Sequence, residues 1–445
     1  MGEGLGKAAA VMAGAFLWAG CEQSYSIKSV GESVPAGPDS APAPIAAPRS
    51  AGPVPTAPPL PSSPVSGPIR SVPSVHPTWQ YSAQQPAECV NTTPIAPTRA
   101  YVRSRSCVLG GSVVDDSQCS GPSLPSREVL ADISCGLCGG AGTLASPYLI
   151  CTADQLNLIS RWDTAPFNKH FRLAADIDMN TASLATSVST SNFVPLPTVA
   201  SFDGNNRVIR NLRYVDASAA PRKTSVGFVD VTPLRYASWA VRDLRFQNAT
   251  YRLGDASLAQ TQADPNWAVS GLLNSPSPNG KDIVNIRFDG LTIEVLHGTA
   301  SVGGVHYGSY HSGEIRDVEI NGLNVRIAGT VWATSDAGGL MPGSVHGTKI
   351  SNVRVGGVID VGGRPGKLGG ILGDSVLGGQ DGILGIVSNC HADVRLLRNG
   401  APADKADGGD YGAIVGGWVP SGFGGRLENC TYNQNAVPGL SATGR

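Results

Sequence analysis

The sequence predicts an all-β protein whose largest part is a solenoid of stacked strands. Glycine accounts for 56 of 445 residues, charged residues make up only 15%, and an internal repeat fills the C-terminal two thirds of the chain. Glycine and other turn residues between short apolar stretches are typical of strands, not of long helices. There are 33 lysines and arginines against 34 aspartates and glutamates, so no basic surplus indicates nucleic-acid binding.

A short apolar run near the start of the chain predicts export. Residues 8–20 are too few to span a bilayer but suit the central region of a signal peptide, assigned to residues 1–20. The run ends in Ala-Gly before Cys21, which resembles the lipobox of bacterial lipoproteins. The resemblance implies that Cys21 is acylated and anchors the protein in a membrane. An ordinary secretory signal is the alternative, and it also exports the protein.

Residues 21–75 are expected to form a disordered, proline-rich stalk. Fourteen prolines lie between Pro35 and Pro77. Proline fixes φ and lacks an amide donor, so this stretch is unsuited to helix or sheet. At about 3.1 Å per residue its reach is on the order of 130 Å. We expect a spacer; a PxxP ligand for a partner domain is the alternative.

The eight cysteines after Cys21 predict disulfides in an exported chain. Trp79 and the run Arg-x-Arg-x-Cys ending at Cys107 make residues 76–139 similar to a thrombospondin type-1 repeat. That resemblance implies arginine stacked on tryptophan, and it implies the disulfides Cys89–Cys135 and Cys107–Cys119. A disulfide-stabilised spacer without a binding role is the alternative.

Cys138 and Cys151 remain at the junction with the next domain, where a bridge would close a short loop. The Cys135-x-x-Cys138 spacing also occurs in redox and zinc sites. No second Cys-x-x-Cys and no pair of histidines at metal spacing follows. We therefore predict a disulfide here, and no metal or other cofactor for the protein.

The repeat combines two motifs. In the first motif, Asn or Asp stands between apolar residues and recurs every 32–42 residues. In the second motif, two small residues precede an apolar residue. The first motif is centred on Asn211, Asp243, Asn285, Asp317, Asn352, Asn389 and Asn429. The second begins at Val226, Ser270, Gly303, Gly338, Gly369 and Gly412.

A period of this length with short strands predicts a solenoid, in which each repeat packs on the next. Equivalent residues of stacked parallel strands lie about 4.8 Å apart. The apolar residue after Asn or Asp, such as Leu212 or Leu244, should then form an internal ladder. Asn tolerates the left-handed backbone of a corner, and glycine pairs permit close packing of rungs. A helix from Thr152 to Trp162, opening with a capping box, is predicted to cap the solenoid.

Residues 140–150, 171–179 and 202–212 resemble the opening of bacterial surface proteins with GLUG-type repeats, and the later Gly-Gly strands resemble the repeats themselves. The resemblance covers about residues 140–437 and leaves 438–445 as a C-terminal tail. It implies a right-handed parallel β-helix. GLUG repeats occur in adhesin-like proteins and in the non-catalytic part of some secreted metallopeptidases.

The sequence contains neither His-Glu-x-x-His nor Gly-x-Ser-x-Gly, the motifs of zinc peptidases and serine hydrolases. Enzymes that cleave polysaccharides use clustered carboxylates instead. Asp176 and Asp178 alternate on one face, but they lie in the opening strand and are expected to be structural. Asp407 and Asp410 form a polar turn, for which Ca²⁺ binding is the alternative.

The clearest candidate ligand-binding residues are His306, Tyr307, Tyr310 and His311. They directly follow a Gly-Gly-apolar strand and are expected on a turn, where imidazoles and phenols could bind a sugar or a metal. Tryptophans in similar stretches would stack on sugar faces; these are Trp239, Trp267, Trp332 and Trp418. The alternative is that all these aromatic residues pack loops onto the solenoid.

Cys390 and Cys430 occupy the ladder position of the last two repeats. We expect them to be stacked in adjacent rungs as buried, free thiols, because parallel in-register strands aim both Cβ atoms the same way. An even cysteine count favours a bridge instead.

Together these features predict an exported lipoprotein, anchored at the bacterial cell surface and most simply in the outer membrane. The repeat domain is expected to bind a glycan or a cell-surface partner in adhesion. The alternatives are a polysaccharide-active lyase or hydrolase and a purely structural envelope component. An enzyme would require carboxylates, or a Lys/Arg–carboxylate set, converging in a groove.

If Cys21 is acylated, Cys21→Ser should release the protein from membranes, because one polar side chain replaces the lipid anchor. Fractionation of cells with labelled palmitate measures both effects. A Cys21→Ser protein that still sediments with membranes and still incorporates palmitate would contradict the lipobox assignment.

Overall fold

The computed structural model describes 76–94, 96–121, 125, 127–162, 168–183, 190–218, 224–230, 240–259, 265–274, 279–308, 310–330, 333–364, 366–377, 384–417 and 425–444. The expected signal peptide, Cys21 and the expected stalk lie outside these residues. In the described part of the chain, no helix is long and apolar enough to cross a membrane. The structure confirms the predicted all-β class, with a parallel β-solenoid after a disulfide-rich module.

The disulfide-rich module contains two small antiparallel sheets, in the orders β1-β4-β5 and β2-β3-β6. Its elements are β1 (Thr78–Tyr81), β2 (Gln85–Asn91), β3 (Thr98–Val102), β4 (Arg105–Leu109), β5 (Ser112–Val114), η1 (Asp116–Gln118), β6 (Arg127–Ala131) and η2 (Ile133–Gly136). Few of its side chains are buried. Sheets this small bury too little apolar surface to be stable alone, so covalent links must supply part of the stability.

Three disulfides and two cation–π contacts hold the module and its junction. The disulfides are Cys89–Cys135, Cys107–Cys119 and Cys138–Cys151, the pairs that the resemblance and the spacing indicated. The Arg105 guanidinium lies 4.8 Å from the centre of the Trp79 ring. The Arg103 guanidinium lies 5.3 Å from the Tyr81 ring in the same way. Each arginine thus gains electrostatic attraction to an aromatic face while it covers that face from water.

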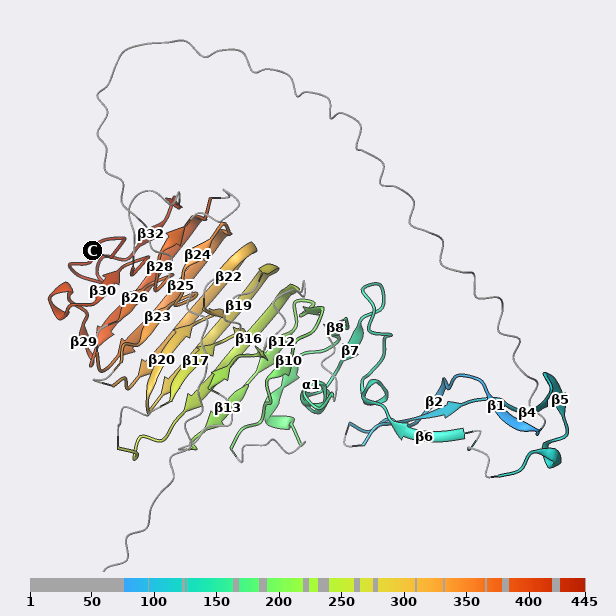
Figure 1. The fold of residues 1–445 in the computed structure, drawn as a ribbon. Coiled ribbons are helices and arrows are strands. Elements are labelled where there is room, and N and C mark those ends of the chain that lie inside the picture. The colour runs from blue at the N-terminus through green and yellow to red at the C-terminus, as the bar shows by residue number, and fades with distance from the viewer. Residues whose placement is uncertain are drawn as a thin grey trace, which may run out of the picture. The chain divides into compact units, whose positions relative to one another are not determined.

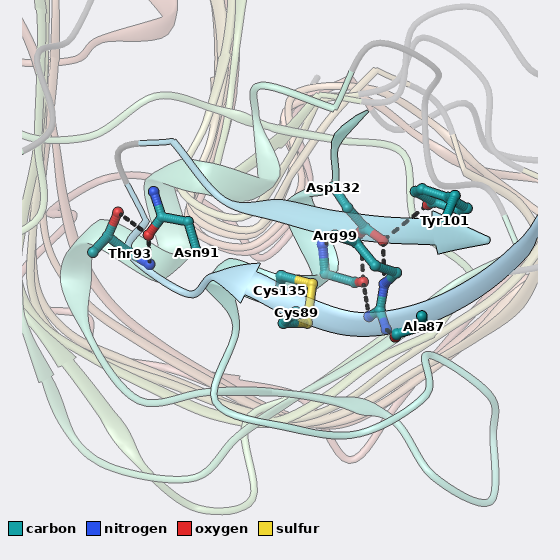
Figure 2. The surroundings of a disulfide bond; sticks show 9 residues. Ala87, Cys89, Asn91, Thr93, Arg99, Tyr101, Asp132 and Cys135 are labelled. Atoms are coloured by element: carbon teal, nitrogen blue, oxygen red, sulfur yellow. Dashed lines mark hydrogen bonds and ion pairs between the residues drawn. A yellow bond between two sulfur atoms is a disulfide. The ribbon is translucent and has the colours of Figure 1, made fainter. Parts of the chain in front are cut away.

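An ion pair beside the Cys89–Cys135 disulfide ties β3 to η2 (Figure 2). The Arg99 Nε donates to Asp132 Oδ2 at 2.6 Å, and the Tyr101 hydroxyl donates to the same oxygen at 3.1 Å. Burial raises the pKa of Asp132, but hydrogen bonds from Ser134 and Arg99 outweigh it and hold that pKa below its usual range. The carboxylate is therefore charged at neutral pH and fixes this corner of the module.

The predicted capping helix is present as α1 (Ala153–Ile159). The Thr152 side chain accepts from the Gln155 amide, and the Gln155 side chain accepts from the Cys151 amide, so two otherwise unpaired donors are satisfied. The helix buries three of its own apolar side chains in the core of the solenoid, those of Leu156, Leu158 and Ile159. The neighbouring elements are β7 (Tyr148–Ile150), β8 (His170–Leu173), β9 (Ile177–Asp178), η3 (Met179–Thr181), β11 (Ser201–Asp203), β12 (Val208–Arg210) and β13 (Arg213–Asp216).

Five long parallel strands form the main face of the solenoid and lie side by side in chain order (Figure 1). They are β16 (Ala240–Leu253), β19 (Asn279–Val295), β22 (Tyr310–Ile327), β25 (Lys349–Val361) and β28 (Ile386–Arg398). Smaller elements beside them are β24 (Val345–His346), β27 (Val376–Leu377), β29 (Ala401–Pro402), η4 (Lys405–Asp407), β31 (Arg426–Glu428) and β32 (Thr431–Tyr432).

Two further parallel sheets lie on the other sides of the solenoid, and the shorter one continues beyond β21 as isolated bridges such as Met341–Leu372. One contains β14 (Ser225–Val226), β17 (Asn266–Ser270), β20 (Thr299–Gly303), β23 (Asp336–Gly338), β26 (Lys367–Gly369) and β30 (Asp410–Gly412). The other contains β10 (Leu196–Pro197), β15 (Val229–Asp230), β18 (Leu273–Asn274) and β21 (His306–Tyr307). The apolar core lies between these two sheets and the main face.

The long strands bend where Asn or Asp adopts the left-handed conformation. Each of these residues has a φ between 51° and 57°; they are Asp243, Asn285, Asp317, Asn352 and Asn389. Their side chains bond from rung to rung, for example from Asn285 Nδ2 to Asp243 Oδ1 at 2.7 Å. The apolar residue that follows is in register throughout the ladder Leu244, Ile286, Val318, Val353 and Cys390, as the repeat predicted.

The predicted ladder position of Leu212, in the first copy of the motif, is wrong. Arg213 pairs with Thr250, so the preceding Leu212 stands level with Ala249 and not with Leu244. Asn211 is likewise left-handed, with φ 56°, but at a second corner that it shares with Asn248. Both corners require the same backbone, so the same residue types appear at both.

The glycine pairs form a third corner, where neighbouring rungs touch backbone to backbone. A Cβ atom at Gly304 would overlap the carbonyl oxygen of Gly339, and one at Gly339 would overlap that of Gly370. The small residues are therefore required by the spacing of the rungs and not only by the turn.

The C-terminal end differs from two expectations. Cys390 and Cys430 form a disulfide, so they are not free thiols. Cys430 keeps the register of the ladder, because Ser388 pairs with Glu428 and His391 pairs with Thr431. The two stacked cysteines have their Cα atoms 4.4 Å apart, a separation that still permits a disulfide. Residues 441–444 are not a tail, because they hydrogen-bond to the rung at 413–415 and form the last layer of that corner.

Gly339→Ala should lower the free energy of unfolding by about 1–3 kcal/mol, because the new methyl group would force two rungs apart. The matched control is Gly356→Ala, where the added Cβ would find its nearest neighbour at 3.7 Å. The control should change stability by less than about 0.5 kcal/mol. Urea unfolding of both variants measures the difference, and equal effects would contradict the backbone-contact argument.

Candidate functional site

The structure places the four predicted ligand-binding residues in two consecutive strands. His306 and Tyr307 lie in strand β21 and not on a turn, and Tyr310 and His311 begin β22. His306 is completely buried in register with Leu273, so it faces the core and is inaccessible to an external ligand. Tyr307 is half-buried, and burial raises its pKa. The side chains of Tyr310 and His311 fall outside the described residues.

Other residues that the sequence singled out are structural where they are described. Trp267 is buried, and its Nε1 donates to the His297 carbonyl oxygen at 3.0 Å; Trp239, Trp332 and Trp418 lie outside the described residues. Asp176 pairs with Arg210 at 2.9 Å, and Asp178 accepts from the Asn211 amide. Asp407 forms an ion pair with Arg398 at 2.9 Å, so a side chain of the protein itself balances the charge of this carboxylate.

A polar hollow of about 510 Å³ lies on the outer surface of the long strands, beside the left-handed corner. Val284 of β19 stands in register between Arg242 of β16 and Arg316 of β22. A short side chain between two long ones leaves a gap in the outward row of the sheet. The lining also includes Ala240, Asp243, Asp282, Asn285 and Asp317.

Carboxylates hold both arginines that border the gap. Arg242 donates to Asp203 at 3.1 Å, and Asp203 is also held by Arg172 at 2.9 Å. Arg316 contacts Asp317 at 2.6 Å and Glu314 at 3.3 Å. These pairs are partly exposed and contribute little to stability, so their main effect is to orient the guanidinium groups.

The carboxylate at the edge of the hollow is kept ionised. The Asn352 amide donates to Asp317 Oδ1 at 2.9 Å, and together with Arg316 it holds the pKa of Asp317 below its usual range. A carboxylate of this kind accepts hydrogen bonds but is a poor proton donor at neutral pH. Asp317 is therefore suited to accepting hydrogen bonds from a polar ligand and unsuited to acting as a general acid.

A second charged set lies on the sheet that contains β23, β26 and β30. Lys367 pairs in register with Asp410, and its Nζ lies 2.8 Å from Asp374 Oδ2. Burial raises the pKa of Asp336, and the nearby charges of Asp374 and Asp410 raise it further against the opposing effect of Lys367. This is the Lys–carboxylate set that an enzyme would require, although no groove over it is recorded among the described residues.

Neither charged set is marked by a motif in the sequence. Arg242, Val284 and Arg316 are 42 and 32 residues apart, and they become neighbours only through the pairing of the rungs. The usable signal is the position directly before each left-handed Asn or Asp, because Arg242, Val284 and Arg316 all occupy it.

No family model and no curated protein matches the chain. Among solved structures, the chain is similar to a putative immunoglobulin A1 protease from Bacteroides ovatus, at 20% sequence identity. The similarity covers 67% of this chain and 79% of that one, with a TM-score of 0.41.

Asp336→Asn should raise the melting temperature at pH 7 by about 1–3 °C. The pKa of Asp336 is higher in the folded than in the unfolded protein, so the protonated side chain favours folding at low pH. This contribution to stability is lost as the pH rises through the folded-state pKa. Asparagine keeps the oxygen that accepts from the Lys367 amide. Melting curves from pH 3 to pH 8 should therefore show the largest gain at high pH, and a loss of stability at pH 7 would contradict the assigned cause.

Proposed function

We propose that the protein is an exported, lipid-anchored surface protein whose solenoid binds a glycan or another cell-surface partner in adhesion. The observation that carries the proposal is the polar hollow among the outward rows of the long strands, with oriented donors and ionised acceptors side by side. Cys21, the proline-rich stalk and the resemblance to adhesin-like GLUG proteins support the location.

The outward rows suit an extended polar ligand because they are fixed and regular. Parallel strands place equivalent side chains about 4.8 Å apart, and the left-handed corners lock the register. Arginine offers several N–H donors, whereas Asp and Asn offer oxygen acceptors. A glycan presents hydroxyl groups that both donate and accept, so it can engage both kinds of group along several rungs. A binding site on rigid elements needs little ordering when the ligand arrives.

A second candidate function, hydrolysis of a polysaccharide, is favoured by the Asp336 set. Asp336 and Asp410 lie on the same face, two rungs apart across Lys367, which corresponds to about 9.6 Å between their Cα atoms. Inverting glycosidases use two separated carboxyl groups, one as the acid and one as the base. The raised pKa of Asp336 would suit the acid.

The two functions are separated by one experiment on the full-length Cys21→Ser protein. A glycan array measures binding, and an assay for new reducing ends measures cleavage of every glycan that binds. Binding without cleavage is expected. Cleavage that is lost in Asp336→Asn would favour the hydrolase, and an array with no bound glycan, together with no binding to cells, would contradict the adhesion proposal.

The double variant Tyr307→Ala with Tyr310→Ala tests the sequence-derived site in the same array, with melting temperature as the check on folding.

A further inference from the structure

We propose that the hollow over Val284 is a subsite for a single uncharged sugar ring of the bound glycan. This inference rests on the proposed binding function and adds a position, an orientation and a chemical class. It starts from one irregularity: the outward row reads Arg242, Val284, Arg316 on three adjacent strands. The arginines stand two rungs apart, about 9.6 Å between Cα atoms, with an aliphatic side chain between them.

The floor of the subsite is apolar and the rim is polar. Val284 and Ala240 present methyl groups to the hollow, and these suit the C–H face of a sugar ring, which loses water when it packs on them. Binding sites for small molecules combine such an apolar surface with a few fixed polar groups that set the orientation. Here Arg242 and Arg316 lie on the strands to either side of Val284, so a bound sugar ring would form hydrogen bonds at its edges.

The two arginines are positioned before a ligand arrives. Arg242 is held by Asp203, and Arg316 by Asp317 and Glu314. Each guanidinium has five N–H groups, and these contacts leave some of them for a ligand oxygen. Because the ion pairs already fix the side chains, little conformational entropy is lost on binding.

Acceptors line the corner side of the hollow. Asn285 donates its amide to Asp243 at 2.7 Å, which turns the amide oxygen away from that contact. For this oxygen no donor is recorded among the described residues, and it is therefore available to a sugar hydroxyl. Asp282, on the opposite side, accepts the Glu314 backbone amide at 3.2 Å through Oδ1.

The charge of the lining determines the class of sugar. Two arginines face three aspartates, Asp243, Asp282 and Asp317, so the sum is −1. A uronate or sulfated ring would bring a further negative charge to this surface, whereas an uncharged ring meets both donors and acceptors. The subsite therefore prefers a neutral sugar to its acidic counterpart.

The test uses the full-length Cys21→Ser protein and calorimetric titration with neutral hexasaccharides of glucose, mannose and xylose, and with a hexamer of galacturonate. Val284→Trp fills the hollow and should weaken binding of the neutral probe about tenfold or more. Its matched control is Val208→Trp, at another outward-facing, half-buried valine that does not line the hollow. The control should retain wild-type affinity.

Asn285→Gly provides a second variant, because glycine accepts the φ of 54° while it removes the proposed acceptor. It should weaken binding several-fold with a small change in melting temperature. Neutral probes that bind Val284→Trp as well as wild type, or a preference for galacturonate, would overturn the subsite while binding itself stands. If no oligosaccharide binds the wild-type protein, both the subsite and the glycan-binding function fail.

Discussion

The bend in each long strand, made by one residue in the left-handed conformation, is the constraint on which the rest of the solenoid depends. Only glycine, asparagine and aspartate adopt this backbone at low cost, and here Asn or Asp occupies every rung from Asp243 to Asn389. The side chain then bonds to the equivalent residue of the next rung, as Asn352 does to Asp317. The bend thus fixes both the phase of the strand and the register between strands. Once phase and register are set, each following side chain is committed to the core or to solvent.

The hollow is a consequence of that commitment. On three adjacent strands the residue before the left-handed corner follows a core residue, namely Val241, Ile283 or Ile315, and so lies on the outer side of the sheet. Where Val284 stands between Arg242 and Arg316, the outward row has a gap whose walls and floor are set by the same register that builds the core. A change in the corner residue Asn285 would therefore act on both the fold and the surface. This coupling is the reason for testing Asn285 with glycine, the residue that preserves the corner.

The sequence predicted what depends on residue type at a fixed period: the apolar ladder, the glycine corner, the capping helix and the three N-terminal disulfides. It failed where two environments require the same residue. Asn211 satisfies the motif but belongs to a different corner. His306 occupies the position of Met341 and Leu372, where both residues after the small pair face the core. Cys430 keeps the ladder register, and residue type alone does not decide whether two stacked cysteines form a bridge. Residues such as Arg242 and Val284, far apart in sequence, become neighbours only through the register.

The two charged sets show how one fold provides different chemistry on different faces. At the hollow, Asp317 receives bonds from Asn352 and Arg316, and its pKa falls. On the sheet of β23, β26 and β30, Asp336 is more deeply buried among like charges, and its pKa rises. An ionised carboxylate favours hydrogen bonding to hydroxyl groups, whereas a carboxyl group that holds its proton is what acid catalysis needs. The hollow lies beside the first set, so a ligand there meets an ionised Asp317 and two arginines that are already oriented. Fixed donors and acceptors of this kind are what binding of a polar ligand requires, and they are the physical reason for placing binding ahead of hydrolysis.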